Sequence, residues 1–478
     1  MLQEFVPFLD KNNYQIVRFF EFLLEKDDFS ANYKEIEDAL NISSYKLQEI
    51  ISAIHSLGHE IKDVSFSVEN NKVTFTGLDT VTVRKVILHE VRRSIRFKVF
   101  LHAFLNPHDL SDKEFQKREG ISRATYFRIK NKLLHEIGSD LIKKLSTNEV
   151  ACRFYIFNVL YYFSYLTFPN ASVKKRISNT INRAIIIAQL SPTNCQHKQY
   201  LYFGIVNFCR DRIGRRLSHT EDKHLVQAKM TSNTKKFMSF FSKTWPLAAN
   251  NSFWYVRIIS TFLLATGTTS QVIIGSLKNY GQVEKLTSKQ MSLVHDFLRK
   301  DLTAQNDDKL TKALANINAK ILVPFFFNNS YQSVYDQKYY AESYTTVDKL
   351  AKLLITIREK FQSKRSINQT ERVQLYYSYL FVLMSEIPQN NFSEPVHIAV
   401  DFSQGFEYTN YIKEKVSELT FLNVKLDNFI NPKTDIYVAN NIDPSFKNKQ
   451  IVWDHPPLSK DMVQLHDSII QIKKEKNI

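Results

Sequence analysis

The stretch SDKEFQKREGISRATYFRIKNKLLHEI, residues 111–137, has the spacing of two short helices joined by a tight turn. Ser111 and Glu114 form a capping box, in which side chains satisfy backbone donors that a helix start leaves unpaired. Gly120 then supplies the turn, and Ser122 caps the second helix. Apolar residues recur in that helix at spacings of three and four, which predicts one buried face made of Tyr126, Ile129, Leu133 and Ile137.

The same pattern occurs 79 residues earlier in the chain. The residues Glu35, Ile36, Ile42, Ser43, Leu47, Ile50 and Ile54 return as Glu114, Phe115, Ile121, Ser122, Tyr126, Ile129 and Leu133. In this first copy Asn32 and Glu35 are the capping pair, and Asn41-Ile42 is the turn. Two copies predict a tandem pair of helix-turn-helix units, an arrangement typical of proteins that bind DNA.

The outer face of the second helix in each unit is the part that enters a DNA groove. In the second unit we expect Arg123 and Arg128 to contact guanine edges or phosphates, and Asn131 to read adenine. The helix N-terminus is suited to holding a phosphate, and flanking lysines are expected on backbone phosphate or water. The predicted contact residues are therefore Ser122, Arg123, Phe127, Arg128, Lys130, Asn131 and Lys132.

The corresponding face of the first unit is polar but not basic. It consists of Ser43, Ser44, Tyr45, Gln48, Glu49 and Ser52, of which Ser43, Ser44 and Gln48 are candidates for contacting DNA. Because Glu49 would repel phosphate, we expect this unit to assist the second one. Alternating residues over 61–68 and 73–76, separated by Asn70-Asn71, predict the hairpin of a winged helix.

The charge distribution favours the second unit. The formal net charge of +16 points to polyanionic partners. Residues 1–60 hold five Lys and Arg against 11 Asp and Glu, whereas residues 84–132 hold 13 against five. A third basic region, 171–243, holds 14 against three and is either a solvated helical face or a surface that faces phosphate.

Length and composition predict a multidomain, mainly helical chain. It has 478 residues but only 10 glycines, which leaves few tight turns. The start lacks the pattern of a secretion signal, and the apolar stretches 152–168 and 253–275 are interrupted by Arg153, Asn158 and Arg257. We therefore expect core helices, a cytoplasmic protein and no membrane. The three cysteines have no metal-ligand spacing, so neither a metal nor a disulfide is expected.

This order of elements resembles the Mga/AtxA family of virulence regulators of Gram-positive bacteria. The resemblance implies a winged helix-turn-helix at 1–80, a second, Mga-type helix-turn-helix at 81–150, two helical modules related to PTS regulation domains (PRD-like) at 151–285 and 286–392, and a small α/β domain like a PTS EIIB component at 393–478. It also implies double-stranded DNA as a partner, bound with modest sequence specificity. The EIIB-like tail would mediate self-association into a dimer or higher homo-oligomer.

One histidine carries the expectation of control by the sugar phosphotransferase system (PTS). Cys195-Gln-His197-Lys198, followed by an apolar run, resembles the histidine segment of the family's first PRD. His197 is therefore the phosphorylation candidate, with the phospho-carrier HPr as donor, and Lys198, Arg210 and Arg212 are expected to respond to the added charge. No histidine lies between His295 and His397, so the second module lacks such a site.

The tail, from about Glu394, is expected to be a small doubly wound α/β domain. An EIIB enzyme needs a nucleophilic cysteine after the first strand, but no cysteine follows Cys209. The expected elements are strands at 396–400, 421–426, 435–439 and 450–453, and helices at 406–419 and 461–473.

Other catalytic motifs are missing. His89-Glu90 and His135-Glu136 begin like the zinc motif HExxH, but Arg93 and Ser139 stand where its second histidine belongs. With no Walker or GxGxxG loop either, we expect no enzyme and no cofactor. A phosphotransfer enzyme would need the tail cysteine. A PTS-linked RNA-binding antiterminator remains the alternative, although such proteins use a β-rich RNA-binding domain and this N-terminus is helical.

Overall fold

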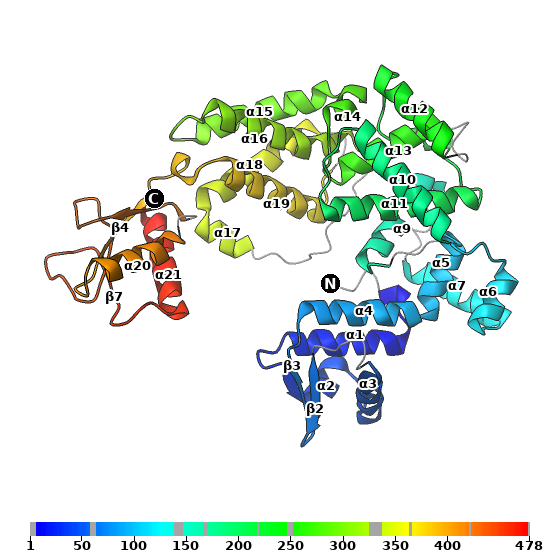
Figure 1. Cartoon of the computed structure of the whole chain (residues 1–478), viewed down its shortest axis with the longest axis horizontal. Helices are drawn as coiled ribbons and strands as arrows, with labels where there is room; N and C mark the ends of the chain where they lie inside the picture. The colour runs from blue at the N-terminus through cyan, green and yellow to red at the C-terminus, as the bar shows by residue number, and fades with distance from the viewer. Residues whose placement is uncertain are drawn as a thin grey trace. The chain divides into compact units, whose positions relative to one another are not determined.

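The computed structural model describes residues 6–57, 64–137, 147–165, 170–217, 219–245, 252–324, 337–362, 366–419 and 422–476 (Figure 1). Backbone contacts divide the chain into two compact units. The first comprises Met1–Leu263 with Thr269–Lys278, and the second comprises Leu264–Thr268 with Asn279–Ile478. The described residues are mainly helical, with a small parallel α/β region at the C-terminal end, as predicted. The finer division into five domains stays a prediction.

The first helix-turn-helix lies beside a small antiparallel sheet. The predicted hairpin is confirmed, since β2 and β3 pair around Asn70 and Asn71, whose φ angles of 48° and 58° suit a type I′ turn. Residues 61–63 of the predicted first strand lie outside the described residues. A short strand that we did not predict, β1, pairs with the other edge of β3. The elements are α1 (Lys11–Leu24), β1 (Ser30–Asn32), α2 (Tyr33–Leu40), α3 (Ser44–Ser56), β2 (Ser65–Glu69), β3 (Lys72–Thr76) and α4 (Thr80–Arg93).

The second helix-turn-helix consists of α5 (Ile95–Phe104), α6 (Asp112–Glu119) and α7 (Arg123–Ile137). Helices α6 and α7 begin and end where the quoted sequence predicts. The core between the three helices contains Phe115 and Tyr126, both buried. Burying these two rings fixes the angle at which α7 leaves the unit.

The two apolar stretches in the first unit form buried helices, as predicted. Arg153 and Arg257 interrupt the apolar runs, yet both are buried, and they form ion pairs with Asp211 and Asp222. A buried charge needs such a partner, so these arginines mark positions where helices meet. The helices are α9 (Glu149–Tyr162), α10 (Ala171–Ile187), α11 (Asn194–Arg212), α12 (Ser232–Thr244), α13 (Ser252–Ala265) and α14 (Gln271–Ser276).

The second unit begins with a helical bundle around one hydrophobic core. Inside it, Gln290 donates hydrogen bonds to the Leu354 carbonyl and the Tyr379 hydroxyl, and that hydroxyl donates to Asn318. These bonds pair the buried side chains of Gln290, Asn318 and Tyr379 with one another. Its helices are α15 (Gly281–Phe297), α16 (Ala304–Asn318), α17 (Gln337–Ser343), α18 (Thr345–Phe361) and α19 (Gln369–Glu386). Among the described residues of the whole chain, no helix is long and apolar enough to cross a bilayer.

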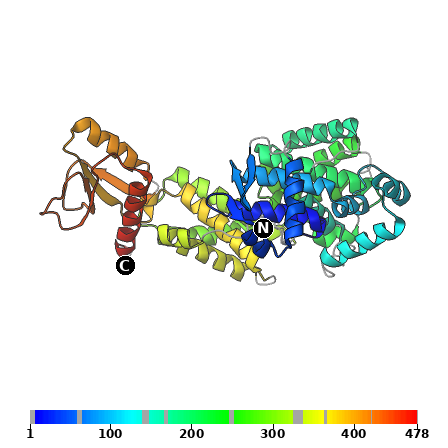
Figure 2. The ribbon, with the colours of Figure 1, turned by 90° about the horizontal axis from the view of Figure 1, so that it is seen from below.

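The tail is a four-stranded parallel sheet in the order β5-β4-β6-β7 with two helices. Figures 1 and 2 show α21, in red, beside this sheet, and the two elements are in contact. All six predicted elements are present, with ends that differ by a few residues. They are β4 (Val396–Asp401), α20 (Phe406–Ser417), β5 (Val424–Asp427), β6 (Ile436–Ala439), β7 (Lys449–Val452) and α21 (Ser459–Lys476).

The prediction that the tail is doubly wound is wrong. Alternate side chains of β4, starting with Val396, form one hydrophobic cluster with Ile412 of α20 and Leu465 of α21, so both helices cover the same face. The opposite face is polar, and there His397 Nδ1 lies 2.9 Å from Asp427 Oδ2. The sequence pattern predicts the two helices but not the face of the sheet that each one covers, which depends on how the chain crosses over.

Candidate nucleic-acid interface

The structure confirms that the two helix-turn-helix units share their local geometry. In each unit the glutamate of the capping box accepts a hydrogen bond from a backbone N–H at the helix start, at 2.9 Å for Glu35 and 2.7 Å for Glu114. The residues that end the first helices, Asn41 (φ 52°) and Gly120 (φ 66°), both adopt the left-handed conformation. Glycine and asparagine adopt it at the lowest cost, so the sequence fixes the same sharp turn twice.

Helix α7 is held in place around the carboxylate of Asp112. Asp112 Oδ1 lies 2.9 Å from His102 Nε2 of α5 and accepts a hydrogen bond from the Tyr126 hydroxyl of α7 at 3.2 Å. The His102 ring also stacks on Phe115, with ring centroids 4.2 Å apart. These contacts join all three helices of the unit. Sequence reasoning missed His102 and Asp112, because neither stands at a motif position.

The pKa values in this cluster keep its hydrogen bonds in place at neutral pH. Partial burial alone would raise the pKa of Asp112, but the hydrogen bonds from His102 and Tyr126 outweigh burial and hold it below its ordinary value. Burial, and then the neighbouring carboxylate, raise the pKa of Tyr126. The phenol therefore remains a donor and the carboxylate an acceptor.

The side chains of α7 divide between core and solvent as predicted. Tyr126 and Leu133 are buried, and Ile129 and Ile137 are half-buried. The predicted contact residues lie on the other side: Ser122, Arg123, Phe127, Arg128, Asn131 and Lys132 are exposed, and Lys130 is half-buried. The helix thus presents a continuous polar and basic face that includes one exposed aromatic ring.

Two arginines carry the unneutralised charge of this face. Within the described residues, no ion pair joins Arg123 or Arg128 to a carboxylate. The Arg123 guanidinium lies over the Phe127 ring, 5.8 Å from its centroid, which orients the side chain without using its N–H donors. The donors of both arginines therefore remain able to contact phosphate or a base edge.

The two lysines of the face are less free. Lys132 Nζ lies 3.9 Å from Glu136, which also pairs with Arg96. Lys130 Nζ lies 5.6 Å from the centre of the Tyr126 ring. The surface ion pair of Lys132 is weak, so a phosphate can still recruit this lysine. The ring contact of Lys130 leaves its positive charge in place, so this lysine also contributes to the field of the face.

Ser122 is engaged within its own helix. Its hydroxyl accepts a hydrogen bond from the Thr125 backbone N–H at 3.1 Å and donates to the Thr125 hydroxyl at 3.0 Å. It is therefore an N-cap first. A phosphate at this helix end would be held by the other unpaired backbone N–H groups and by Arg123.

The corresponding face of the first unit is close to neutral. Ser43 caps α3 through the Lys46 backbone N–H, while Ser44 and Gln48 are exposed. The Lys46 ammonium lies 2.5 Å from Glu49, and its hydrogen bond lowers the pKa of that carboxyl. The repulsion between Glu49 and phosphate is thus partly offset. This face is expected to bind DNA weakly because it lacks positive charge.

His197, the phosphorylation candidate, lies in the first turn of α11. It is half-buried, and its Nε2 is 2.9 Å from Asn182 Oδ1 on α10. A phosphoryl group on Nε2 would break this contact between the two helices. Lys198, the next residue, is exposed.

The expectation that Arg210 and Arg212 respond to His197 is wrong. They stand at the opposite end of α11, which places them ~20 Å along the helix at 1.5 Å per residue. Arg210 is buried and makes two hydrogen bonds to Glu149, at 2.9 and 2.5 Å. Arg212 donates to the Asn106 carbonyl. Arg210 is therefore also neither a solvated nor a phosphate-facing part of the basic region 171–243.

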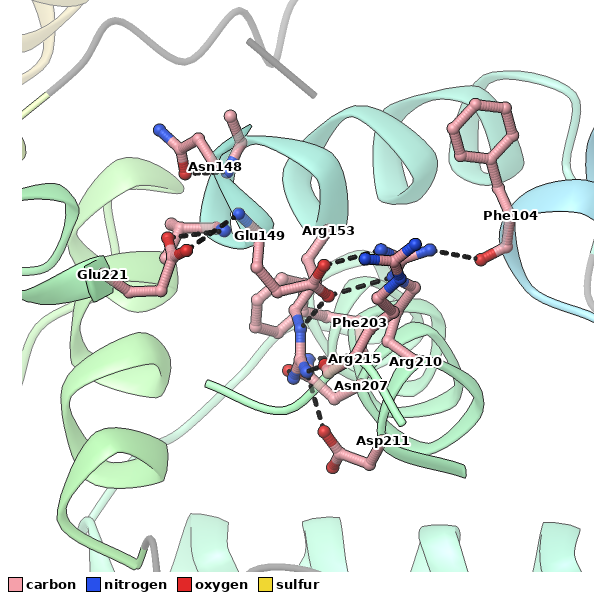
Figure 3. A network of polar contacts seen from close by, with 12 residues as sticks. Phe104, Asn148, Glu149, Arg153, Phe203, Asn207, Arg210, Asp211, Arg215 and Glu221 are labelled. Atoms are coloured by element: carbon pink, nitrogen blue, oxygen red, sulfur yellow. Dashed lines mark hydrogen bonds and ion pairs between the residues drawn. The ribbon is translucent and has the colours of Figure 1, made fainter. Parts of the chain in front are cut away.

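A buried polar network, which we did not predict, joins the second helix-turn-helix to the helices that follow (Figure 3). Arg210 Nη1 donates to the Phe104 carbonyl at the end of α5 at 2.7 Å. Arg153 binds Asp211 at 2.7 Å and Asn207 at 2.6 Å, and shares Glu149 with Arg210. The one signal in the sequence was Arg153 within an apolar run.

Possible metal ligands and three cysteine thiols occur among the described residues. No group of three or more His, Cys, Asp or Glu side chains is placed among them to hold a metal ion. Burial raises the pKa of the Cys152 thiol to about 11 and that of Cys209 to about 12, so neither forms a thiolate near neutral pH. Cys195 is exposed.

The chain matches no protein-family model and no curated protein. The proposed function therefore rests on the geometry of the two helix-turn-helix units.

Proposed function

We propose that this chain is a DNA-binding transcription regulator of the Mga/AtxA type that contacts double-stranded DNA chiefly through α7. The observation that carries the proposal is the exposed face of this helix. Arg123 and Arg128 lie on it without an acidic partner among the described residues, and Asn131 stands beside them. Capping and the Asp112 hydrogen bonds hold the helix that presents them.

Each side chain of the face has a role in this proposal. Arg123, near the helix start, contacts phosphate or a guanine edge, and Phe127 supports its guanidinium. Arg128 and Asn131, further along, reach base edges. Lys130 and Lys132 contribute to the field that attracts the backbone. The face has few groups that can read bases and several cations that bind phosphate whatever the sequence. This balance fits modest sequence specificity.

The first unit assists. Its exposed Ser43, Ser44 and Gln48 are neutral groups that hydrogen-bond phosphate or bases without adding charge. The β2–β3 hairpin is the wing, which lies beside the DNA backbone in winged helices. Helix α7 therefore supplies most of the affinity.

The helical middle is the regulatory part of the proposal, with two PRD-like modules. Phosphorylation of His197 by HPr would add negative charge where α11 meets α10 and break its contact with Asn182. The second module has no histidine between His295 and His397, so control acts through the first module alone.

The EIIB-like tail is proposed to mediate self-association. Each of its four strands is followed by one strongly exposed apolar residue: Phe406 (73% exposed), Phe429 (73%), Ile442 (69%) and Leu458 (55%). Because the strands are parallel, their carboxyl ends share one edge of the sheet. Several large apolar side chains at one edge favour a contact with a second copy of the chain. The proposal needs no catalysis, cofactor or metal, and it assigns the protein to the cytoplasm.

Binding to duplex DNA and to hairpin RNA, measured by fluorescence anisotropy over a salt series, tests the class of nucleic acid. We expect DNA binding whose affinity falls steeply with salt and which excess RNA does not displace. Preferential binding of structured RNA would contradict the proposed DNA-binding function and support the RNA-binding antiterminator. Binding to neither duplex DNA nor hairpin RNA would contradict both hypotheses.

A further inference from the structure

The first unit contains a pocket of about 100 Å³, partly open to the surface, between α10, α11, α12 and α13. Its walls are mainly aliphatic and aromatic. Phe203 and Phe262 stack on one another there, with centroids 4.0 Å apart. On the opposite side Ile181 and Ala184 of α10 complete the wall.

Asn207, Trp245 and the hydroxyl side chains of Thr180, Tyr200 and Tyr255 border the pocket. The Asn207 amide donates to the Phe203 carbonyl at 2.7 Å and accepts from Arg153 at 2.6 Å. The Trp245 indole N–H donates to Asp211 at 3.0 Å. Asn207 and Trp245 are thus already paired, and the surface that lines the pocket is almost entirely apolar, so a molecule inside would make mainly apolar contacts. Water needs polar partners, and a dry apolar cavity on the order of 150 Å³ accepts benzene.

The same wall residues belong to the network that reaches α5. Asn207 binds Arg153, and Trp245 binds Asp211, the partner of Arg153. Arg153 and Arg210 share Glu149, and Arg210 in turn binds the Phe104 carbonyl. Asn207 is thus connected through Arg153 and Glu149 to Arg210, which holds the end of α5 (Figure 3). Trp245 reaches Arg153 through Asp211.

We propose that this cavity is a binding site for a small, uncharged, apolar molecule of about the size of benzene, and that its occupancy tightens the network between α11 and the end of α5. The ligand class follows from the apolar walls and the volume, and the effect follows from Asn207 and Trp245, which belong to both the cavity and the network.

Benzene is the probe for the binding step, with the full chain and its Tm as readout. Saturating benzene raises the Tm of the wild type by about 3 °C, because it binds only the folded state. Ala184→Leu fills the cavity and loses this shift. Ala171→Leu, the same substitution at an exposed position of α10, keeps it. Ile185→Phe is a second filling variant in case Ala184→Leu does not fold.

No benzene shift in the wild type, or an equal shift in the filling variants, would mean that the cavity is only a packing defect or that benzene binds elsewhere. Either result overturns the proposal.

Amide hydrogen exchange tests the second step. Benzene is expected to slow exchange several-fold at residues 105–111, after α5, in the wild type but not in Ala184→Leu. Unchanged exchange there with benzene bound would remove the link to α5. Neither measurement involves DNA, so this inference stands or fails separately from the proposed function.

Discussion

Arg210 Nη1 donates a hydrogen bond of 2.7 Å to the backbone carbonyl of Phe104. This bond satisfies one of the carbonyls that the C-terminal end of α5 leaves unpaired, and it connects two modules that are separate in sequence. Arg210 is itself held by Glu149, which also binds Arg153. The position of the second helix-turn-helix on the helical middle therefore depends on a buried network of charges.

Arg153→Met should strongly destabilise the first unit. The side chains of Arg153 and Asp211 are both 0% exposed, so the variant leaves a buried carboxylate without its cation. Losing one partner of a buried pair costs about 3–5 kcal/mol. The double variant Arg153→Met/Asp211→Leu should recover most of the loss. Urea unfolding of the full chain measures both, and equal stability of the single variant and the wild type would contradict the network's importance.

Gly120→Ala should destabilise the second helix-turn-helix by about 1–2 kcal/mol, because the Cβ of alanine makes the left-handed φ of 66° unfavourable. A Cβ at Gly120 would touch nothing within 4 Å, so the cost is in the backbone alone. Gly120→Asn should cost less, since Asn41 holds the equivalent position in the first unit. Thermal unfolding ranks the three proteins, and a larger loss for asparagine than for alanine would contradict this reading.

Asp112→Asn should make the chain less sensitive to acid. Folding lowers the pKa of Asp112 from its ordinary value of 3.8, so its carboxylate stabilises the folded state above that pH. This contribution is lost as the pH falls through the lowered pKa. Between pH 7 and pH 3 the Tm should therefore fall less in Asp112→Asn than in the wild type. Asp109→Asn, at an exposed position in the same unit, is the control and should follow the wild type.

The proposed self-association through the tail predicts that the variant Phe429→Glu/Ile442→Glu is a monomer. The variant places two charges among the exposed apolar residues at the carboxyl edge of the tail sheet, where a second copy would bury them at high cost. Sedimentation velocity measures the mass. Val463→Glu, at a position 58% exposed on α21, is the control and should stay associated. A dimer that survives the double variant would place the contact elsewhere.

Local features of the fold were predictable because their causes lie within a few residues. Ser111 with Glu114, Gly120, and the alternating faces of α7 follow from capping, backbone freedom and helical periodicity. The unpredicted features depend on residues distant in sequence. Arg153 finds Asn207 and Asp211 through packing that no local pattern records.

The errors have the same origin. The basic residues around Arg210 in the sequence suggest a surface cation, but the packing of α9 against α11 buries this arginine. The tail reads as doubly wound from its alternation of strands and helices, but the side of the sheet on which a helix lies depends on how the chain crosses over. The exposed arginines of α7 were predictable, and the His102 and Asp112 contacts that hold this helix were not.

The central claim is that α7 contacts DNA through Arg123 and Arg128. Binding of a mixed pool of genomic duplex fragments, measured at several salt concentrations, tests it with wild type and Arg123→Ala/Arg128→Ala. Lys309→Ala/Lys312→Ala, which removes the same charge from exposed positions of α16, is the matched control. We predict that the arginine variant loses at least about 10-fold in affinity, and that its slope of log affinity against log salt is shallower by about one to two. The control should bind like the wild type. An arginine variant that is folded and binds DNA as tightly as the control would contradict the account.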